Sequence, residues 1–228
     1  MNQTTDPAAP ISLGMKSETV LAECSAGVME VLLDRPAGEP CGWVIVAHPQ
    51  PLLGGSARHK VPHTLAKALC EAGWLGLRPN FRGVGKSQGT YDEGRGEADD
   101  LVALAQQWHR QEPGLPFALL GFSFGAYVQS FVATRLVAMG MHPRHTCLIG
   151  MPHGVVDSGR RYDPPPDAPP ALVIHGELDT SVPLASILEW ARPRARPVTV
   201  MTGADHFFTG QLHQVKDLVI ERFRKTDR

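Results

Sequence analysis

The ten residues Phe117-Ala-Leu-Leu-Gly-Phe-Ser-Phe-Gly-Ala126 hold the most informative pattern in this chain. An apolar run of strand character leads into Gly121-Phe-Ser123-Phe-Gly125, and a second apolar run of helical character follows. A serine in G-x-S-x-G between a buried strand and a helix is typical of a nucleophile elbow, a tight turn that presents the serine oxygen at the carboxyl edge of a sheet. The flanking glycines lack Cβ atoms that would separate strand from helix. We therefore expect Ser123 to be a nucleophile.

Segments of strand and helix character alternate on both sides of this turn. The expected strands are residues 18–24, 28–34, 42–47, 74–78, 117–121, 146–150, 171–175 and 198–201. The expected helices are residues 61–72, 97–110, 126–138, 183–191 and 211–224. Such alternation requires crossover connections, so it predicts an α/β fold with a mostly parallel central sheet covered on both faces. The first two strands are separated by only three residues and predict an N-terminal antiparallel hairpin.

The length of 228 residues predicts one folded domain. Residues 1–16 begin with a polar, proline-bearing stretch and are expected to form a flexible N-terminal tail, with residues 17–228 as the single domain. Residues 151–170 are too few for a separate cap domain. Their proline-rich part, residues 162–170, is expected to be an extended loop.

The amino-acid composition argues against several classes of binding partner. With 22 basic and 23 acidic residues the formal charge is −1, which argues against nucleic acid and against an electrostatic membrane anchor. The N-terminus has no signal-peptide pattern, and no apolar run is long enough for a membrane span. The four cysteines are far apart, which favours free thiols over zinc ligation or a disulfide framework. We expect a cytoplasmic protein.

A serine hydroxyl needs a base to accept its proton, and the base needs an orienting acid. Asp179 follows the expected strand 171–175, and His206 follows the expected strand 198–201, so both should lie at the same sheet edge as Ser123. The order Ser, Asp, His along the chain is that of the α/β-hydrolases. His206 is therefore the expected base and Asp179 the expected acid, with Glu177 and Asp205 as lower-ranked alternatives.

The developing oxyanion needs two preorganised N–H donors. The first is expected to be the backbone N–H of Phe124, directly after the nucleophile. The second should come from the loop that follows the strand 42–47. Because Pro49 and Pro51 have no N–H, Gln50 is the expected donor and Leu52 the alternative.

Two other sequence patterns resemble a phosphate-binding loop and a metal site, but each motif is incomplete. Residues 83–87, Gly-Val-Gly-Lys-Ser, resemble the end of a phosphate-binding loop, yet Asn80 stands where the full pattern needs glycine, so a tight turn is expected. His59 and His63 have the spacing of a helical metal pair but lack an H-E-x-x-H motif and a third ligand, so solvated histidines are expected.

Taken with these residues, nearly the whole chain resembles the small bacterial α/β-hydrolases of the dienelactone-hydrolase-like branch that have no cap domain. The resemblance is carried by H-P-Q-P-L-L-G-G at 48–55, L-R-P-N-F-R-G-V-G-K-S at 77–87, Y-D-E-G-R-G-E at 91–97, and the G-F-S-F-G, H-G-E-L-D and G-A-D-H-F-F segments. It implies an α/β-hydrolase fold. It also implies Ser123, Asp179 and His206 as nucleophile, acid and base, and an oxyanion loop over residues 48–51.

These observations predict a serine esterase that cleaves carboxylic esters, or thioesters, of small or exposed acyl groups through an acyl-serine intermediate. No metal and no organic cofactor is expected, and the partner is a small-molecule acyl substrate. A peptidase or amidase, a perhydrolase, and a non-catalytic binding protein on the same fold remain alternatives, because the same three side chains serve several reactions. The oligomeric state is open.

Overall fold

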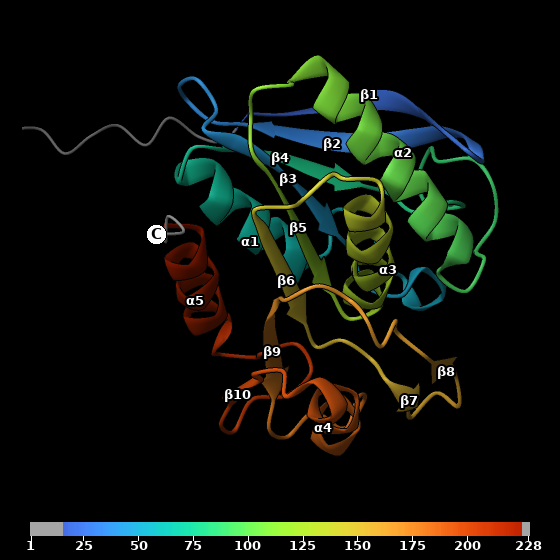
Figure 1. Ribbon diagram of the computed structural model, residues 1–228, viewed down its shortest axis with the longest axis vertical. Helices are drawn as coiled ribbons and strands as arrows, with labels where there is room; N and C mark the ends of the chain where they lie inside the picture. Colours follow the sequence, from blue (N-terminus) through green and yellow to red (C-terminus); the bar gives the residue numbers. More distant parts are fainter. Residues whose placement is uncertain (1–15, 225–228) are drawn as a thin grey trace, which may run out of the picture.

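The computed structural model describes residues 16–224 and shows an eight-stranded sheet with helices on both faces (Figure 1). The predicted tail, residues 1–16, lies outside the described residues apart from Lys16, which begins the first strand, and so do the last four residues of the predicted domain. The strands are β1 (Lys16–Cys24), β2 (Gly27–Arg35), β3 (Gly42–Ala47), β4 (Trp74–Pro79), β5 (Phe117–Phe122), β6 (His145–Ile149), β7 (Gly154–Val155), β8 (Arg161–Tyr162), β9 (Leu172–Gly176) and β10 (Thr199–Met201). The helices are α1 (Lys60–Glu71), α2 (Arg95–Gln111), α3 (Phe124–Ala138), α4 (Leu184–Ala191) and α5 (Leu212–Arg224), with short 3₁₀ turns η1 (Pro51–Leu53) and η2 (Arg192–Arg194).

The sheet has the strand order β1-β2-β4-β3-β5-β6-β9-β10. The β1–β2 and β2–β4 pairs are antiparallel, and the pairs from β4 to β10 are parallel. The predicted α/β fold, with an N-terminal antiparallel hairpin on a mostly parallel sheet, is therefore confirmed. The element boundaries agree with the sequence-based ones to within a few residues, because each apolar run has the length and periodicity of its element.

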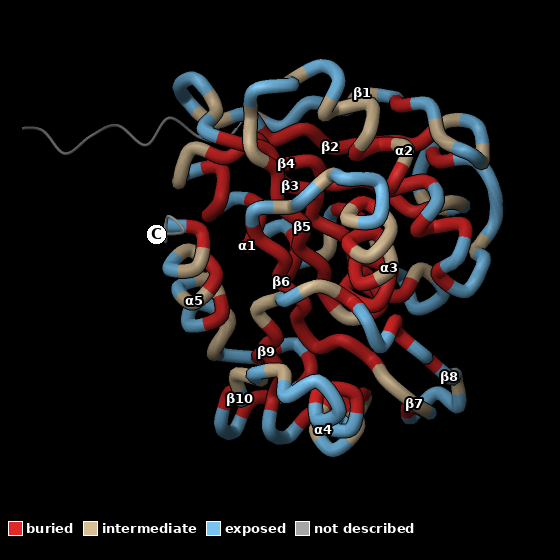
Figure 2. The backbone as a smooth tube through the Cα atoms, viewed as in Figure 1, coloured by how far each residue is buried: buried red, intermediate tan, exposed pale blue. Residues whose placement is uncertain are grey.

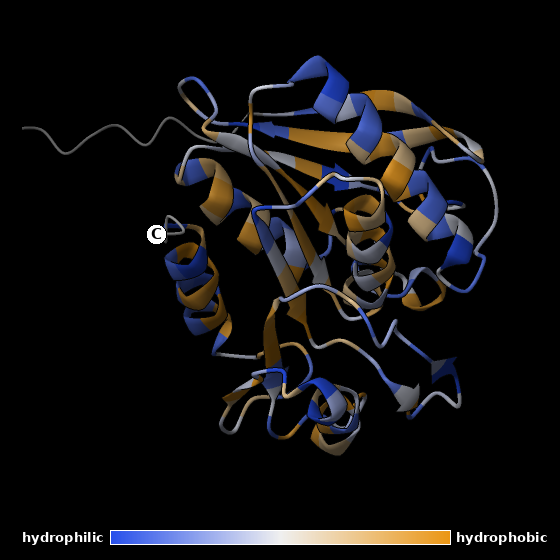
Figure 3. Ribbon diagram, viewed as in Figure 1, coloured by the Kyte–Doolittle hydropathy of each residue, from blue (hydrophilic) through white to orange (hydrophobic). Residues whose placement is uncertain are grey.

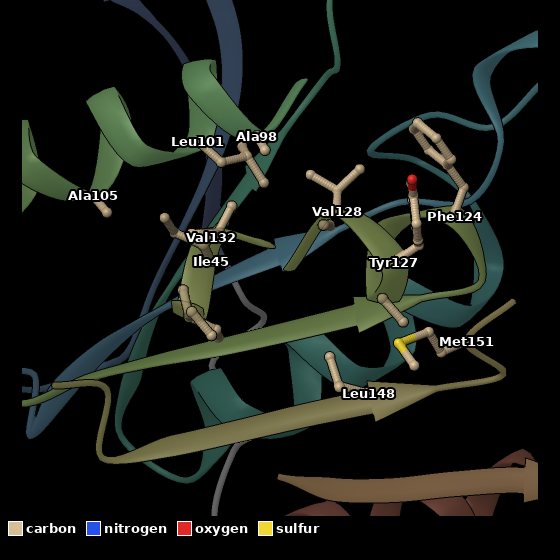
Figure 4. Close-up of a cluster of buried hydrophobic side chains, with 14 of the residues drawn as sticks. Ile45, Ala98, Leu101, Ala105, Phe124, Tyr127, Val128, Val132, Leu148 and Met151 are labelled. Atoms are coloured by element: carbon tan, nitrogen blue, oxygen red, sulfur yellow. The ribbon is translucent and has the colours of Figure 1, made fainter. Parts of the chain in front are cut away.

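The central strands are buried on both faces, and successive side chains on β3 face two different cores. Trp43, Ile45 and Ala47 belong to the core beneath α2, α3 and α4, whereas Val44 and Val46 belong to the core beneath α1 and α5. Figure 2 shows the strands as the buried centre of the molecule, and Figure 3 shows polar residues on the outer faces of the helices. Figure 4 shows apolar side chains of α2 and α3 packed over the sheet.

Residues 151–170 were expected to hold no separate cap domain, with an extended loop over 162–170, and the structure differs from the expected loop at Tyr162. Gly154–Val155 and Arg161–Tyr162 pair as a small antiparallel ribbon, β7–β8, at one end of the molecule (Figure 1). The rest of this stretch contains neither helix nor further strand, so the prediction of no separate cap domain holds. Two-residue strands have no hydrophobic period to read, which is why the sequence did not show the ribbon.

None of the helices formed by residues 16–224 is long and apolar enough to cross a lipid bilayer.

The four cysteines are free thiols, and burial raises the pKa of Cys147 to about 12. Within the same residues no group of three or more histidine, cysteine or acidic side chains could hold a metal ion.

A buried ion pair ties the hairpin to the centre of the sheet. Arg78 Nε donates to Asp34 Oδ2 at 2.6 Å and its Nη2 donates to Oδ1 at 2.8 Å, while Nη1 donates to the Ala57 carbonyl at 2.7 Å. Both side chains are 3% exposed or less. Two parallel bonds from one guanidinium to one carboxylate are the strongest geometry for such a pair. This pair explains the polar Arg78 inside an otherwise apolar strand.

Replacing Asp34 by Ala should therefore destabilise the fold strongly. The substitution leaves the Arg78 charge buried without its partner, which costs about 3–5 kcal/mol. Urea unfolding at equilibrium measures the change. Glu18→Ala is the matched control on the same hairpin, because Glu18 pairs with Arg35 at 2.9 Å on the surface and an exposed pair contributes about 1 kcal/mol or less. Equal losses for the two variants would contradict the role given to the buried pair.

Candidate active site

The predicted nucleophile lies in a strained turn between β5 and α3. Ser123 has φ 55° and ψ −122°, a backbone region that non-glycine residues rarely adopt. A Cβ on Gly121 would lie 2.3 Å from the Gly125 carbonyl oxygen, and a Cβ on Gly125 would lie 2.4 Å from the Ala47 carbonyl oxygen. Both glycines are therefore required sterically, which is the physical reason for the G-x-S-x-G pattern.

Three side chains from distant parts of the sequence form one continuous hydrogen-bond chain. Ser123 Oγ lies 3.0 Å from His206 Nε2, and His206 Nδ1 lies 2.6 Å from Asp179 Oδ2. A carboxylate can only accept, so His206 carries its hydrogen on Nδ1 and leaves Nε2 free to accept the serine proton. The structure thus brings together the three residues singled out in the sequence.

The predicted acid, Asp179, is held by hydrogen bonds within its own loop. Asp179 Oδ1 accepts a hydrogen bond from the Val182 N–H at 2.7 Å. The carbonyl of Val182 lies 2.8 Å from Nε2 of the fully buried His175, whose pKa is lowered chiefly by burial. Neutral His175 therefore donates to Val182 and holds the loop in the shape that presents Asp179 to His206.

The two alternative acids are engaged elsewhere. Glu177 Oε2 accepts from the Gly203 N–H at 2.8 Å. Asp205 Oδ1 accepts from the N–H groups of Phe207 and Thr209 at 3.1 and 2.9 Å, and these bonds lower its pKa. Both carboxylates stabilise turns around His206 rather than its ring.

The loop that contains Gln50 lies beside Ser123, and backbone hydrogen bonds within the loop hold it in place. Both predicted oxyanion donors, the N–H groups of Gln50 and Phe124, donate to no other group of the described residues. The Leu52 N–H, the alternative donor, donates to Gln50 Oε1 at 3.4 Å. Among the two loop candidates, the Gln50 N–H is the one left available.

The buried ring of His48 orients the Gln50 loop through hydrogen bonds. The ring is fully buried, accepts the Phe81 N–H at Nε2 (3.0 Å) and therefore donates from Nδ1 to the Pro49 carbonyl (2.7 Å). The Pro49–Gln50 peptide is planar and trans, so fixing its oxygen on His48 directs the Gln50 N–H to the opposite side. Burial lowers the pKa of His48 to about 4, which keeps the ring neutral at physiological pH.

His48 should make the fold less stable in acid. The unfolded side chain takes up a proton near pH 6.5 and the folded one only near 4, so unfolding takes up a proton between these values. The contribution is fully present above pH 6.5 and is lost as the pH falls to 4, amounting to about 3 kcal/mol. Denaturant unfolding across this range measures the slope. His48→Gln should reduce the slope and leave the part that comes from His175 and His59, whose pKa values are also lowered by burial, and His213→Gln, on the exposed side of α5, should not change it; a slope that is unchanged in His48→Gln would contradict the assignment.

Two tyrosines that the sequence analysis missed complete the site. The buried amide nitrogen of Gln50 donates to the hydroxyl of Tyr162 at 2.9 Å and to that of Tyr91 at 3.3 Å. Tyr162 comes from strand β8, so the small ribbon is attached to the oxyanion loop through this contact. Tyr91 lies in the Y-D-E-G stretch singled out above, but nothing in its sequence pattern points to Gln50.

The site opens into a cleft of about 190 Å³. Apolar side chains of Leu53, Val156 and Phe207 line it together with Ser123 and His206. His59 also lines the cleft, contrary to the expectation of a solvated residue. Its Nδ1 accepts from the Val61 N–H at the start of α1, and its pKa is lowered by burial and then by the neighbouring His206.

Comparison with known proteins agrees with this architecture. Residues 89–206 match the model of the thioesterase domain family. A crystal structure from Xanthomonas campestris, described as an α/β serine hydrolase without a lid, is 32% identical, with 96% of this chain and 97% of that one covered at a TM-score of 0.78. An α/β serine hydrolase homologue from Coxiella burnetii is 36% identical, with 92% and 99% covered at a TM-score of 0.75.

A curated protein of Rickettsia prowazekii, described as uncharacterised, is 33% identical over 175 residues, which are 72% of this chain and 71% of the relative. The family match spans Ser123, Asp179 and His206, and the structural matches cover nearly the entire chain. The chain therefore belongs to the thioesterase domain family and is related to the small α/β serine hydrolases among these structures.

Proposed function

We propose that this protein hydrolyses carboxylic esters and thioesters of short acyl groups through an acyl-serine intermediate. The observation that carries the proposal is the unbroken contact from Ser123 Oγ through His206 to Asp179, at 3.0 and 2.6 Å, at the base of an open cleft. A hydroxyl, a neutral imidazole and a carboxylate in this order are the components of nucleophilic acyl transfer.

In the first half of the reaction, Ser123 Oγ attacks the carbonyl carbon while His206 Nε2 takes the hydroxyl proton. Asp179 holds the ring in the required tautomer and stabilises the imidazolium that forms. The Phe124 and Gln50 N–H groups donate hydrogen bonds to the negative oxygen of the tetrahedral intermediate. His206 then gives its proton to the leaving alcohol or thiol, and the acyl-serine remains.

In the second half, His206 takes a proton from water, and the resulting hydroxide attacks the acyl-serine carbonyl. The same N–H groups stabilise the second tetrahedral intermediate. Its collapse releases the carboxylic acid and returns the proton to Ser123 Oγ. The cleft of about 190 Å³ favours short acyl groups, because a long chain would lie mostly in solvent.

The test is covalent labelling followed by a substrate series. A fluorophosphonate should add to the intact protein once, on the peptide that contains Ser123. Hydrolysis of 4-nitrophenyl acetate and butyrate should exceed that of the laurate. Failure to label Ser123, with no hydrolysis of any ester, would favour a binding protein on this fold and overturn the proposal.

Thioesters are named beside oxygen esters because of the match to the thioesterase domain family. Butyryl thioesters and butyryl oxygen esters with leaving groups of similar acidity separate the two substrate classes. We expect both to be cleaved, with the ratio of kcat/KM showing which class the enzyme prefers. Preferential cleavage of aminoacyl amides would instead identify a peptidase or amidase.

A further inference from the structure

Arg160 is a cation in the cleft that has no acidic partner within the described part of the chain. It lines the same cleft as Ser123 and His206 and is half-buried. Among residues 16–224, none of the carboxylates lies within 4.0 Å of its guanidinium, whereas the next residue, Arg161, pairs with Asp163 at 2.9 Å. A free guanidinium presents a planar set of donors that matches a carboxylate or phosphate.

The turn of the β7–β8 ribbon holds the backbone of Arg160 in place. The Val156 N–H donates to the Arg160 carbonyl at 2.9 Å, and the Gly159 N–H donates back to the Val156 carbonyl at 2.8 Å. Two residues further on, Tyr162 is attached to Gln50 of the oxyanion loop. The backbone of Arg160 is thus anchored on the same framework as the predicted oxyanion donor, and only its side chain is free to adapt.

The positive charge of Arg160 acts on two tyrosine hydroxyls that bind the Gln50 side chain. Burial raises the pKa values of Tyr91 and Tyr162, and the positive charge of Arg160 opposes this rise in both. These two hydroxyls accept the hydrogen bonds of the Gln50 amide. Because Arg160 also lines the cleft that contains Ser123, its guanidinium is placed to act on a substrate bound there.

The lining of the cleft combines apolar and charged side chains. Leu53, Val156 and Phe207 supply apolar contacts, and Leu53 and Phe207 are 71% and 49% exposed. The other charged side chain of the ribbon in the cleft is Asp157, which is exposed and makes no ion pair with Arg160. A substrate with an apolar body and a negatively charged end would match both kinds of lining side chain.

We infer that Arg160 recognises a negatively charged group on the substrate, so that the preferred esters or thioesters carry a carboxylate or phosphate besides the bond that is cleaved. This inference rests on the proposed function and narrows its substrate class. The charged group lies either on the acyl part or on the leaving group, and the test below separates the two positions.

The test compares matched neutral and charged substrates. For the acyl side, the mono-4-nitrophenyl ester of adipic acid is compared with its methyl ester. For the leaving side, the butyrate ester of 4-hydroxybenzoate is compared with that of methyl 4-hydroxybenzoate. In one of the two pairs, kcat/KM should be about tenfold higher for the charged member, mainly through a lower KM, as expected for one partly exposed charge-assisted contact. Added salt should reduce this preference.

Three variants assign the preference to a residue. Arg160→Gln should abolish it, Arg160→Lys should retain part of it, and Arg161→Gln should leave it unchanged, because Arg161 sits one position away and is paired with Asp163. A partial loss with Lys is expected since the ammonium keeps the charge but not the planar pair of donors.

The outcomes are distinguishable. Hydrolysis of the neutral esters with no preference for either charged member, or a preference that survives Arg160→Gln, would overturn this inference and leave the proposed function intact. Absence of hydrolysis for all four substrates, together with no labelling of Ser123, would overturn the proposed function and this inference with it.

Discussion

The Ser123→Ala variant should lose at least about 10⁴-fold in kcat, and up to about 10⁶-fold, on any substrate of the wild type. The variant removes the hydroxyl that lies 3.0 Å from His206 Nε2 and that His206 would deprotonate. What remains is binding and the N–H donors of the oxyanion loop, which act on a water of ordinary reactivity. Steady-state hydrolysis of 4-nitrophenyl butyrate measures the loss, and the thermal unfolding curve should show an intact fold.

Ser158→Ala is the matched control for this experiment. Ser158 lines the same cleft and is exposed, and it takes no part in the Ser123–His206–Asp179 contacts. We expect its kcat to stay within about threefold of the wild type, as for surface positions outside the reacting groups. Retention of wild-type kcat by a folded Ser123→Ala protein would refute the nucleophile assignment.

The Asp179→Asn variant should lose about 10⁴-fold in kcat. The Val182 N–H binds Oδ1 at 2.7 Å, so the amide oxygen must occupy that position and the amide NH₂ must face His206 Nδ1. Nδ1 then accepts, the ring hydrogen moves to Nε2, and the ring no longer accepts the proton of Ser123. The loss therefore comes from the wrong tautomer, with little change in shape, and should appear in kcat far more than in KM.

Asp205→Asn tests the alternative acid beside His206. Asp205 accepts from the N–H groups of Phe207 and Thr209, and its substitution should change the stability of that turn while kcat stays within about tenfold of the wild type. A collapse of kcat in Asp205→Asn with near-normal activity in Asp179→Asn would reverse the assignment of the acid.

The fold was predictable because its signals are local. The buried strands β3 and β5 are continuous apolar runs, and helices α1 and α2 carry apolar residues at helical spacing. The elbow is likewise local, since Gly121 and Gly125 are fixed by clashes within one turn and against the adjacent strand. Parallel strands place their carboxyl ends at one edge, so Asp179 and His206 could be placed near Ser123 from chain order alone.

The polar contacts were not predictable in the same way. Arg78 finds Asp34 across 44 residues, and the Gln50 amide finds Tyr162 across 112. Neither partner stands in a pattern, because a hydrogen bond depends on a distance and an angle that only the folded chain sets. The sequence therefore predicted the tight turn at residues 83–87, but it did not predict the ion pair between Arg78 and Asp34.

What the sequence by itself determined is the α/β sheet, its N-terminal hairpin, the strained serine turn and the candidate acid and base, since hydrophobic period and steric demand are written in neighbouring residues. What only the tertiary structure decided is the β7–β8 ribbon, the attachment of Tyr162 to Gln50, the orientation of the Pro49–Gln50 peptide by His48, and the unpaired Arg160 in the cleft. These features arise where segments distant along the chain meet, and their energies come from contacts that exist only after the sheet has assembled.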